Sequence, residues 1–178
     1  MIVFGHVIRQ LKRDTLKGVE FTIGQVQAPS PKAHVDFSET NIEASLGRVI
    51  PGAVDWMNSG KAKRWQVLGI WRPIKTVSRD PLVLTDSRSV PAGDYRDLSR
   101  EKSLGQKLYV TMITHGEGSN HRWHYLSDMN PEEVLIFKHY DSKKDIPAWR
   151  CGHTSVNISG TEDLPARESI EVRAFVGY

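Results

Sequence analysis

The sequence predicts a mainly β protein with a few helices, arranged as a barrel or sandwich with helical packing on one side. Three observations support this fold class. Short runs rich in β-branched and aromatic residues recur along most of the chain, separated by clusters of Gly, Pro, Asp and Ser. Helical spacing is confined to one early region, 40–57. The length of 178 residues suits one domain with a sizeable core, so we expect a single domain over 1–178.

Strands are predicted wherever an apolar or alternating run is bounded by turn residues. In chain order, these runs are 2–9, 20–28, 32–38, 64–74, 81–86, 107–113, 122–128, 132–142, 152–158 and 168–178. The polar stretch 86–106 reads as one long connection. Because connections of that length are uncommon in small domains, we expect it to be a functional loop, such as a lid or the rim of a pocket.

Two short helices are expected between the third and fourth strands. The stretch TNIE (40–43) matches a capping box, with Thr40 as the cap and Glu43 reaching back. Three apolar residues at helical spacing should then face the core: Ile42, Leu46 and Val49. Pro51 and Gly52 should end this helix, and a second one should cover 53–57.

Composition argues against several classes of protein. The formal net charge is +3 and Lys and Arg are scattered, so we expect no nucleic-acid partner. No apolar run is long enough to span a membrane, so we expect no membrane partner. The single cysteine, Cys151, precludes an internal disulfide and fits a reducing compartment, which predicts a cytoplasmic location. The chain contains no GxSxG elbow, P-loop or dinucleotide-binding GxGxxG.

The stretch KAHVDFS (32–38) places His34 and Asp36 two residues apart. Side chains at i and i+2 of a strand point to the same face, so both can reach one ion. An imidazole nitrogen with a carboxylate suits a divalent first-row metal, and two histidines with one carboxylate form the facial triad of non-haem Fe(II) oxygenases. Alone, the two residues fit a solvent-facing strand equally well.

A third ligand is available late in the chain. His153 lies on a predicted strand, and Arg167 and Ser169 follow fourteen and sixteen positions later. A guanidinium donates two parallel hydrogen bonds to a carboxylate, and a neighbouring hydroxyl can add a third. The order HxD, His, RxS therefore favours a metal site with a carboxylate-bearing cosubstrate over a solvent-facing strand or a zinc hydrolase.

This order resembles that of the Fe(II)/2-oxoglutarate-dependent oxygenases, whose core is a double-stranded β-helix (jelly-roll, cupin-like). Three longer strings resemble one group within that family, and they are VLGIWRPI (67–74), RWHYLSDMNPEEVLIFKHYDS (122–142) and PARESIEVRAFV (165–176). The group comprises gibberellin-desaturase and aspergillic-acid hydroxylase/desaturase relatives, together with the small chain of the cephalosporin 7-methoxylation system. The resemblance covers essentially the whole chain, and implies a domain lacking the N-terminal extension usual in the family.

The resemblance implies roles for particular residues. His34, Asp36 and His153 would be the catalytic iron ligands, with Arg167 and Ser169 binding 2-oxoglutarate. Residues on the family strings that we expect, less directly, to contact substrate are Trp71, Arg72, Trp123 and Tyr125. The cofactor would be Fe(II), with 2-oxoglutarate and O₂ as cosubstrates. The expected activity is oxidation of a small secondary metabolite by hydroxylation, desaturation or ring formation.

Several alternatives stay open at this stage. Arg173 has the same strand parity as Ser169 and competes with Arg167, although we expect it to pair with an acid or to face solvent. His115 and His121 bracket a glycine-rich loop and are either substrate contacts or solvated. The protein could also be an iron-dependent oxidase that does not use 2-oxoglutarate, or a non-catalytic binding subunit that retains the metal site. The sequence does not identify the small-molecule substrate. It also leaves open whether the chain forms a homo-oligomer or binds a partner subunit.

Overall fold

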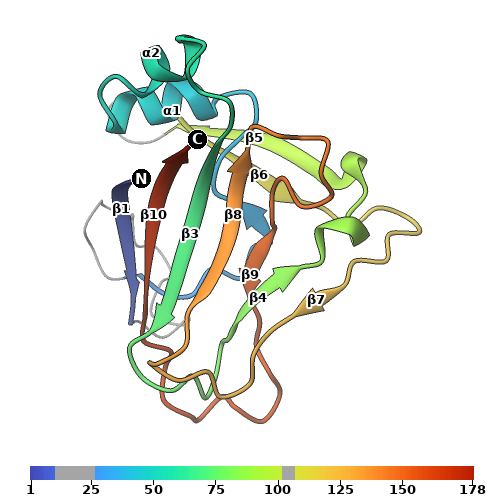
Figure 1. The fold of residues 1–178 in the computed structure, drawn as a ribbon. Coiled ribbons are helices and arrows are strands. Elements are labelled where there is room, and N and C mark those ends of the chain that lie inside the picture. The colour runs from blue at the N-terminus through green and yellow to red at the C-terminus, as the bar shows by residue number, and fades with distance from the viewer. Residues whose placement is uncertain (11–26, 102–106) are drawn as a thin grey trace.

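The computed structural model describes residues 1–10, 27–101 and 107–178 (Figure 1). The strands are β1 (Ile2–Arg9), β2 (His34–Val35), β3 (Trp65–Pro73), β4 (Leu82–Thr85), β5 (Tyr95–Glu101), β6 (Lys107–Ile113), β7 (Trp123–His124), β8 (Leu135–Asp141), β9 (His153–Ser155) and β10 (Ser169–Gly177). The helices are α1 (Ile42–Val49) and α2 (Ala53–Asn58), with 3₁₀ turns η2 (Ser87–Ser89) and η3 (Ala92–Asp94). Most of the predicted strand 20–28 lies outside the described residues.

These strands form two antiparallel sheets. The first has the order β1-β10-β3-β8, and the second has the order β5-β6-β2-β9-β4-β7. Figure 1 shows the two sheets facing each other, with α1 and α2 covering one end near both chain termini. Strands far apart in sequence become neighbours in this arrangement, since β2 pairs with both β6 and β9. The prediction of a mainly β protein with helices on one side is therefore confirmed.

Two apolar clusters fill the space between the sheets. One lies beneath the helices and includes Leu46, Trp65 and Phe175. The other includes Trp71 and Phe137 and lies further along β3 and β8. The buried ring of His139 lies between the two clusters. Phe37, which packs on the first cluster, and Phe137, which belongs to the second, both contact this ring.

The helix α1 differs from its prediction at both ends. Its N-cap residue is Asn41, so the expected capping box at Thr40 is wrong; the Thr40 hydroxyl instead donates to Asp97. The expected burial of Val49 is also wrong, since it is 54% exposed. Apolar burial runs in four-residue steps, through Ile42, Leu46 and Ile50. Burying one such side chain contributes about 1.5–3 kcal/mol against roughly 1 kcal/mol for a cap, so packing holds this helix in place.

In its described part, 86–101, the predicted long connection 86–106 contains regular structure. Residues 95–101 form β5, which pairs in register with β6 from Tyr95↔Ile113 onward. β5 is an edge strand, and its Leu98 is exposed. Because such a strand buries little on either face, its sequence needs no apolar residues at alternate positions. Polar contacts hold it to the sheet, because Thr111 donates to Asp97 at 2.5 Å.

Candidate metal centre

His34, Asp36 and His153 converge between the two sheets, as the sequence predicts. His34 on β2 lies directly opposite His153 on β9, and their ring centroids are 4.4 Å apart. β2 is shorter than expected, ending at Val35, and the chain bends at Asp36. That bend brings the Asp36 carboxylate back to the two rings, so the three side chains meet although only two are on strands.

The three residues present one donor atom each to a common point. Asp36 Oδ1 lies 3.2 Å from His34 Nε2 and 3.5 Å from His153 Nε2. His34 Nδ1 lies 2.6 Å from the Lys32 carbonyl oxygen. Because a carbonyl can only accept, Nδ1 carries a proton, and Nε2 is the ring nitrogen directed at Asp36 and His153. Two imidazole nitrogens with one carboxylate oxygen, all within 4.8 Å of one another, can hold a divalent ion.

Burial and charge act in opposite directions on the ionisation of Asp36. Desolvation would raise the pKa of its carboxyl, but Arg173, followed by His139 and the two cluster histidines, outweighs it and holds the pKa well below the usual range. Arg173 donates to Asp36 Oδ2 from Nε at 2.7 Å, and its Nη2 lies 2.5 Å from the same oxygen. Asp36 is therefore an anion, as metal ligation requires.

The two histidines respond differently to the same surroundings. Burial lowers the pKa of His153, with a further lowering from His34, which keeps the imidazole neutral. Burial also acts to lower the pKa of His34, but the contacts with Asp36 and the Lys32 carbonyl outweigh it, so the net shift is upward. The buried His153 Nδ1 has no hydrogen-bond partner among the described residues.

A second set of buried groups lies beside the first and shares Asp36 with it. His139 Nε2 is 3.1 Å from Glu171 Oε1 and 3.7 Å from Asp36 Oδ2. Its ring packs edge-on against His153 at 5.3 Å. Burial raises the pKa of Glu171, but the hydrogen bond with His139 outweighs it and the net shift is downward. Asp36, His139 and Glu171 also satisfy the three-donor geometry of a metal site.

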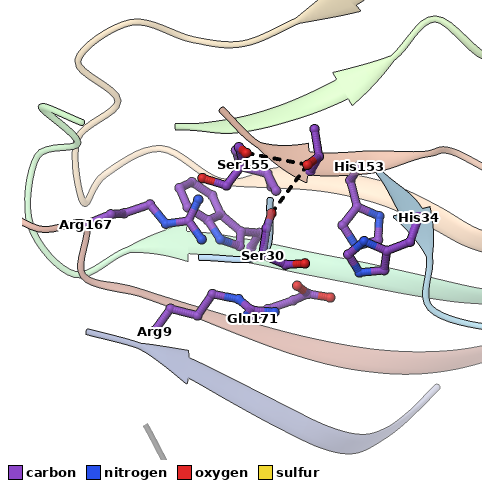
Figure 2. Close-up of a pocket in the computed structure, with 10 residues that line it drawn as sticks. Arg9, Ser30, His34, His153, Ser155, Arg167 and Glu171 are labelled. Atoms are coloured by element: carbon purple, nitrogen blue, oxygen red, sulfur yellow. Dashed lines mark hydrogen bonds between the residues drawn. The ribbon is translucent and has the colours of Figure 1, made fainter. Parts of the chain in front are cut away.

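A small cavity that opens to solvent extends from the histidines, and its lining includes Arg9, His34, Trp71, His153, Arg167 and Glu171. Figure 2 shows His34 and His153 at one end of this cavity and Arg167 at the other, with Glu171 between them. The Arg167 guanidinium lies over the Trp71 ring at 5.4 Å, and its Nη1 donates to the Asp80 carbonyl at 2.8 Å. The Ser169 hydroxyl, two residues on, is buried with no hydrogen-bond partner among the described residues.

Of the predicted substrate contacts, the structure brings only Trp71 to this cavity. Arg72 is exposed on the other face of β3 and donates from Nε to the Pro131 carbonyl. Trp123 on the short strand β7 is half-buried and Tyr125 is 45% exposed; neither lines the cavity. A substrate role for these three stays a prediction. Of the loop histidines, His121 is buried and lies 2.7 Å from Asp94, which argues against its being solvated.

Sequence reasoning missed three residues of the cluster. Arg9, His139 and Glu171 were given no role, and Arg173 was expected either to pair with an unidentified acid or to face solvent. The period of two on β10 carries the missed signal, since Ser169, Glu171 and Arg173 share a face. Three polar residues alternating with apolar ones on a late strand indicate a polar interior.

Comparisons with known proteins agree with this geometry. A family model described as "YDMC: Oxidoreductase/YMDC permease-like domain" matches residues 1–177. The chain belongs to this family. Relatives include "Hydroxylase/desaturase efuI" of Hormonema carpetanum, 36% identical over 99% of this chain, and "Alpha-ketoglutarate-dependent dioxygenase phiK" of a fungal species, 32% identical over all of it. The "Gibberellin cluster GA4 desaturase" of Gibberella fujikuroi is 28% identical over 92% of the chain.

The family has a solved structural neighbour. The "iron and alpha-ketoglutarate-dependent endoperoxidase NvfI" superposes on 99% of this chain with a TM-score of 0.78 and 23% sequence identity. This likeness confirms the double-stranded β-helix core, and the names of the relatives confirm the resemblance inferred from the sequence strings. The chain spans 63% of the length of efuI and of phiK, and 61% of NvfI. None of the helices in the described part of the chain has the length and apolar character of a membrane-spanning segment.

Proposed function

We propose that this chain carries the metal- and cosubstrate-binding core of a non-haem Fe(II)- and 2-oxoglutarate-dependent dioxygenase. Its activity is hydroxylation, desaturation or ring formation on a small secondary metabolite. The observation that supports the proposal is the cavity with two histidines at one end and an arginine at the other (Figure 2). The relatives' names, which specify α-ketoglutarate dependence and hydroxylase/desaturase activity, support the same cofactor and reaction class.

The residues present fit this cofactor and cosubstrate. His34, Asp36 and His153 would hold Fe(II) through Nε2, Oδ1 and Nε2. The bound iron supplies the activation of O₂ that is coupled to conversion of 2-oxoglutarate into succinate. Arg167 would bind the far carboxylate of 2-oxoglutarate, with the buried Ser169 hydroxyl as a further donor. A buried hydroxyl without a partner is costly, and a carboxylate arriving beside it would satisfy it.

The protein's part is positioning, charge balance and exclusion of water. The Lys32 carbonyl holds the proton on His34 Nδ1, which keeps Nε2 directed at the metal position. Trp71 walls the cavity beneath Arg167, so a bound dicarboxylate is held against an apolar surface. Because Arg167 is buried, a charge-assisted hydrogen bond from it to the cosubstrate is stronger than the same bond in water.

Anaerobic spectroscopy on the whole chain tests the proposal. Adding Fe(II) and 2-oxoglutarate should produce the weak visible metal-to-ligand charge-transfer band of a chelated iron complex, and His34→Ala should abolish it. His124→Ala is the matched control, because that histidine is exposed on β7. Equal iron binding by His34→Ala and the parent would show that the ligand assignment is wrong.

Two alternative functions are separated by turnover. Substrate oxidation undiminished by omission of 2-oxoglutarate would identify an oxidase that does not use this cosubstrate. Binding of Fe(II) and 2-oxoglutarate without succinate release, across a screen of small secondary metabolites, would favour a non-catalytic subunit. We further expect that the protein is cytoplasmic and that residues 1–178 form a single domain. We also expect either a homo-oligomer or a partner subunit.

A further inference from the structure

The Asp36 carboxylate divides its two oxygens between different partners. Oδ1 faces the histidine Nε2 atoms at 3.2 and 3.5 Å, whereas Oδ2 accepts the hydrogen bond from Arg173 Nε at 2.7 Å and lies 2.5 Å from Nη2. β2 ends at Val35, so sheet hydrogen bonds do not fix the backbone at Asp36. The side-chain contact with Arg173 is therefore the attachment that determines how this carboxylate is oriented.

The guanidinium that makes this contact is itself confined. Arg173 is on β10, which has β1 on one side and β3 on the other. On the β1 side, a Cβ added at Gly5 would lie 4.0 Å from Nη1, an ordinary van der Waals distance, so the arginine packs close to the β1 backbone. Glu171 Oε1 lies 4.0 Å from Nε, on the same face of β10.

The strand on the other side also has a glycine at this level. Gly69 of β3 pairs directly with Arg173, and a Cβ at Gly69 would lie 2.7 Å from His139 Nε2 and from the Phe137 ring. A side chain at position 69 would displace His139, whose Nε2 lies 3.7 Å from Asp36 Oδ2. The absence of a side chain at position 69 thus leaves room for His139 to approach the carboxylate oxygen that Arg173 contacts.

We propose that Arg173 is a positioning residue for the metal ligand Asp36, holding Oδ2 so that only Oδ1 is presented to the ion. This inference rests on the proposed metal centre. It assigns a role to a residue that is not one of the three proposed ligands. A carboxylate held this way binds an ion through one oxygen, which leaves more of the coordination sphere for cosubstrate and O₂. Without Arg173, the carboxylate can rotate away or bind through both oxygens.

Titration of the whole chain with Mn(II), in the absence of 2-oxoglutarate, tests this role. Mn(II) suits carboxylate ligands and reports its surroundings by electron paramagnetic resonance. Arg173→Met should weaken Mn(II) binding about 10–100-fold, the usual effect of removing a residue that orients a ligand. It should also change the spectrum of the bound ion. Arg173→Lys keeps the charge but loses the planar fork, so its affinity should fall between those of Arg173→Met and the parent.

Arg64→Lys is the matched control. Arg64 makes the same kind of pair with a buried aspartate, Asp141, in the same sheet. Its Mn(II) affinity and spectrum should equal those of the parent, which separates positioning of the ligand from a general effect of breaking an arginine fork. Circular dichroism on each variant establishes that it is folded, and if Arg173→Met is unfolded, the comparison of Arg173→Lys with Arg64→Lys decides.

Parent-level Mn(II) affinity in folded Arg173→Met, or in Arg173→Lys where only that variant folds, would overturn the proposal. If the parent chain itself binds no Mn(II) or Fe(II), the metal centre and the positioning role fail together. Failure of 2-oxoglutarate turnover alone would overturn the proposed reaction and leave the positioning role standing, because the readout is binding of the ion.

Discussion

Asp36 and Asp141 are both aspartates that bind an arginine, with side chains 13% and 0% exposed, and they differ in the partners of their remaining oxygen lone pairs. Both Oδ atoms of Asp141 accept from Arg64, at 2.9 and 2.6 Å. The side chains of Gln66 and Lys138 and the Lys143 amide donate to it as well, and the side chain is 0% exposed. Lys138 Nζ lies 2.8 Å from Asp141 Oδ2, so this network includes an ion pair within β8.

Asp36 has fewer fixed donors. Among the described residues, the permanently charged partner of Asp36 is Arg173, which contacts Oδ2, whereas Oδ1 faces the Nε2 atoms of His34 and His153. Asp141 is thus satisfied by fixed donors on both oxygens. Asp36 presents one oxygen to two imidazole nitrogens, and its proposed role as a metal ligand rests on that arrangement.

The largest expected effect is on the structural member of the pair. Asp141→Asn should lower the free energy of unfolding by about 3–5 kcal/mol, because it leaves Arg64 and Lys138 without their buried counter-charge. Urea denaturation of variant and parent measures this difference. A loss under 1 kcal/mol would mean that the network is no more than a surface ion pair.

Substitution of Asp36, and not of Asp141, should abolish the stabilisation that a bound metal ion provides. A ligand at 100 times its dissociation constant stabilises the folded state by about 2.7 kcal/mol. The parent and Asp141→Asn should both gain this stabilisation from Mn(II), whereas Asp36→Asn should gain none. Thermal unfolding with and without the ion measures the gain, and an equal increase in Asp36→Asn would remove Asp36 from the ligand set.

The contrast between these aspartates was only partly visible in the sequence. His34, Asp36 and His153 could be grouped because the HxD and RxS pairs follow the period of a strand and match a family order. The bend at Asp36 and the pairing of β2 with β9 depend on tertiary structure, so the local sequence pattern does not reveal them. Parity on β10 placed Arg173 on the face of Ser169 but left open whether it meets an acid or solvent, and its contact with Asp36 depends on β2 ending at Val35.

The fold was predictable where local patterning determines it. Long apolar strands such as β3 and β10 were found, while β5 was missed because an edge strand held by polar contacts has no apolar alternation. Val49 was misplaced because helical spacing allows either a three- or a four-residue step at the end of α1, and packing of Ile50 selects the second. Such choices depend on neighbours that are distant in sequence.

Acid should weaken the structural aspartate in a defined direction. Burial raises the pKa of Asp141, but hydrogen bonds from Arg64, Lys138 and Gln66 outweigh it, so the folded-state pKa lies below the unfolded value near 3.9. A carboxyl with a depressed pKa contributes stability above its unfolded pKa and loses it as pH falls toward the folded one. The stability gap between parent and Asp141→Asn should therefore be full above about pH 5 and shrink progressively below about pH 4. Denaturation at a series of pH values measures it, and a gap that widens in acid would contradict the assigned sign.

The smallest effect on stability should come from an ion pair that is equally short but exposed to solvent. Glu39 Oε1 lies 2.5 Å from Lys144 Nζ, as close as Arg173 Nη2 is to Asp36, but the two side chains are 40% and 44% exposed. Water competes for both charges there, so Glu39→Gln should change the free energy of unfolding by less than about 1 kcal/mol. The same urea titration measures it beside Asp141→Asn. If the two variants lost similar stability, the short contact itself would determine the energy; a several-fold difference would show that burial and the number of fixed donors do.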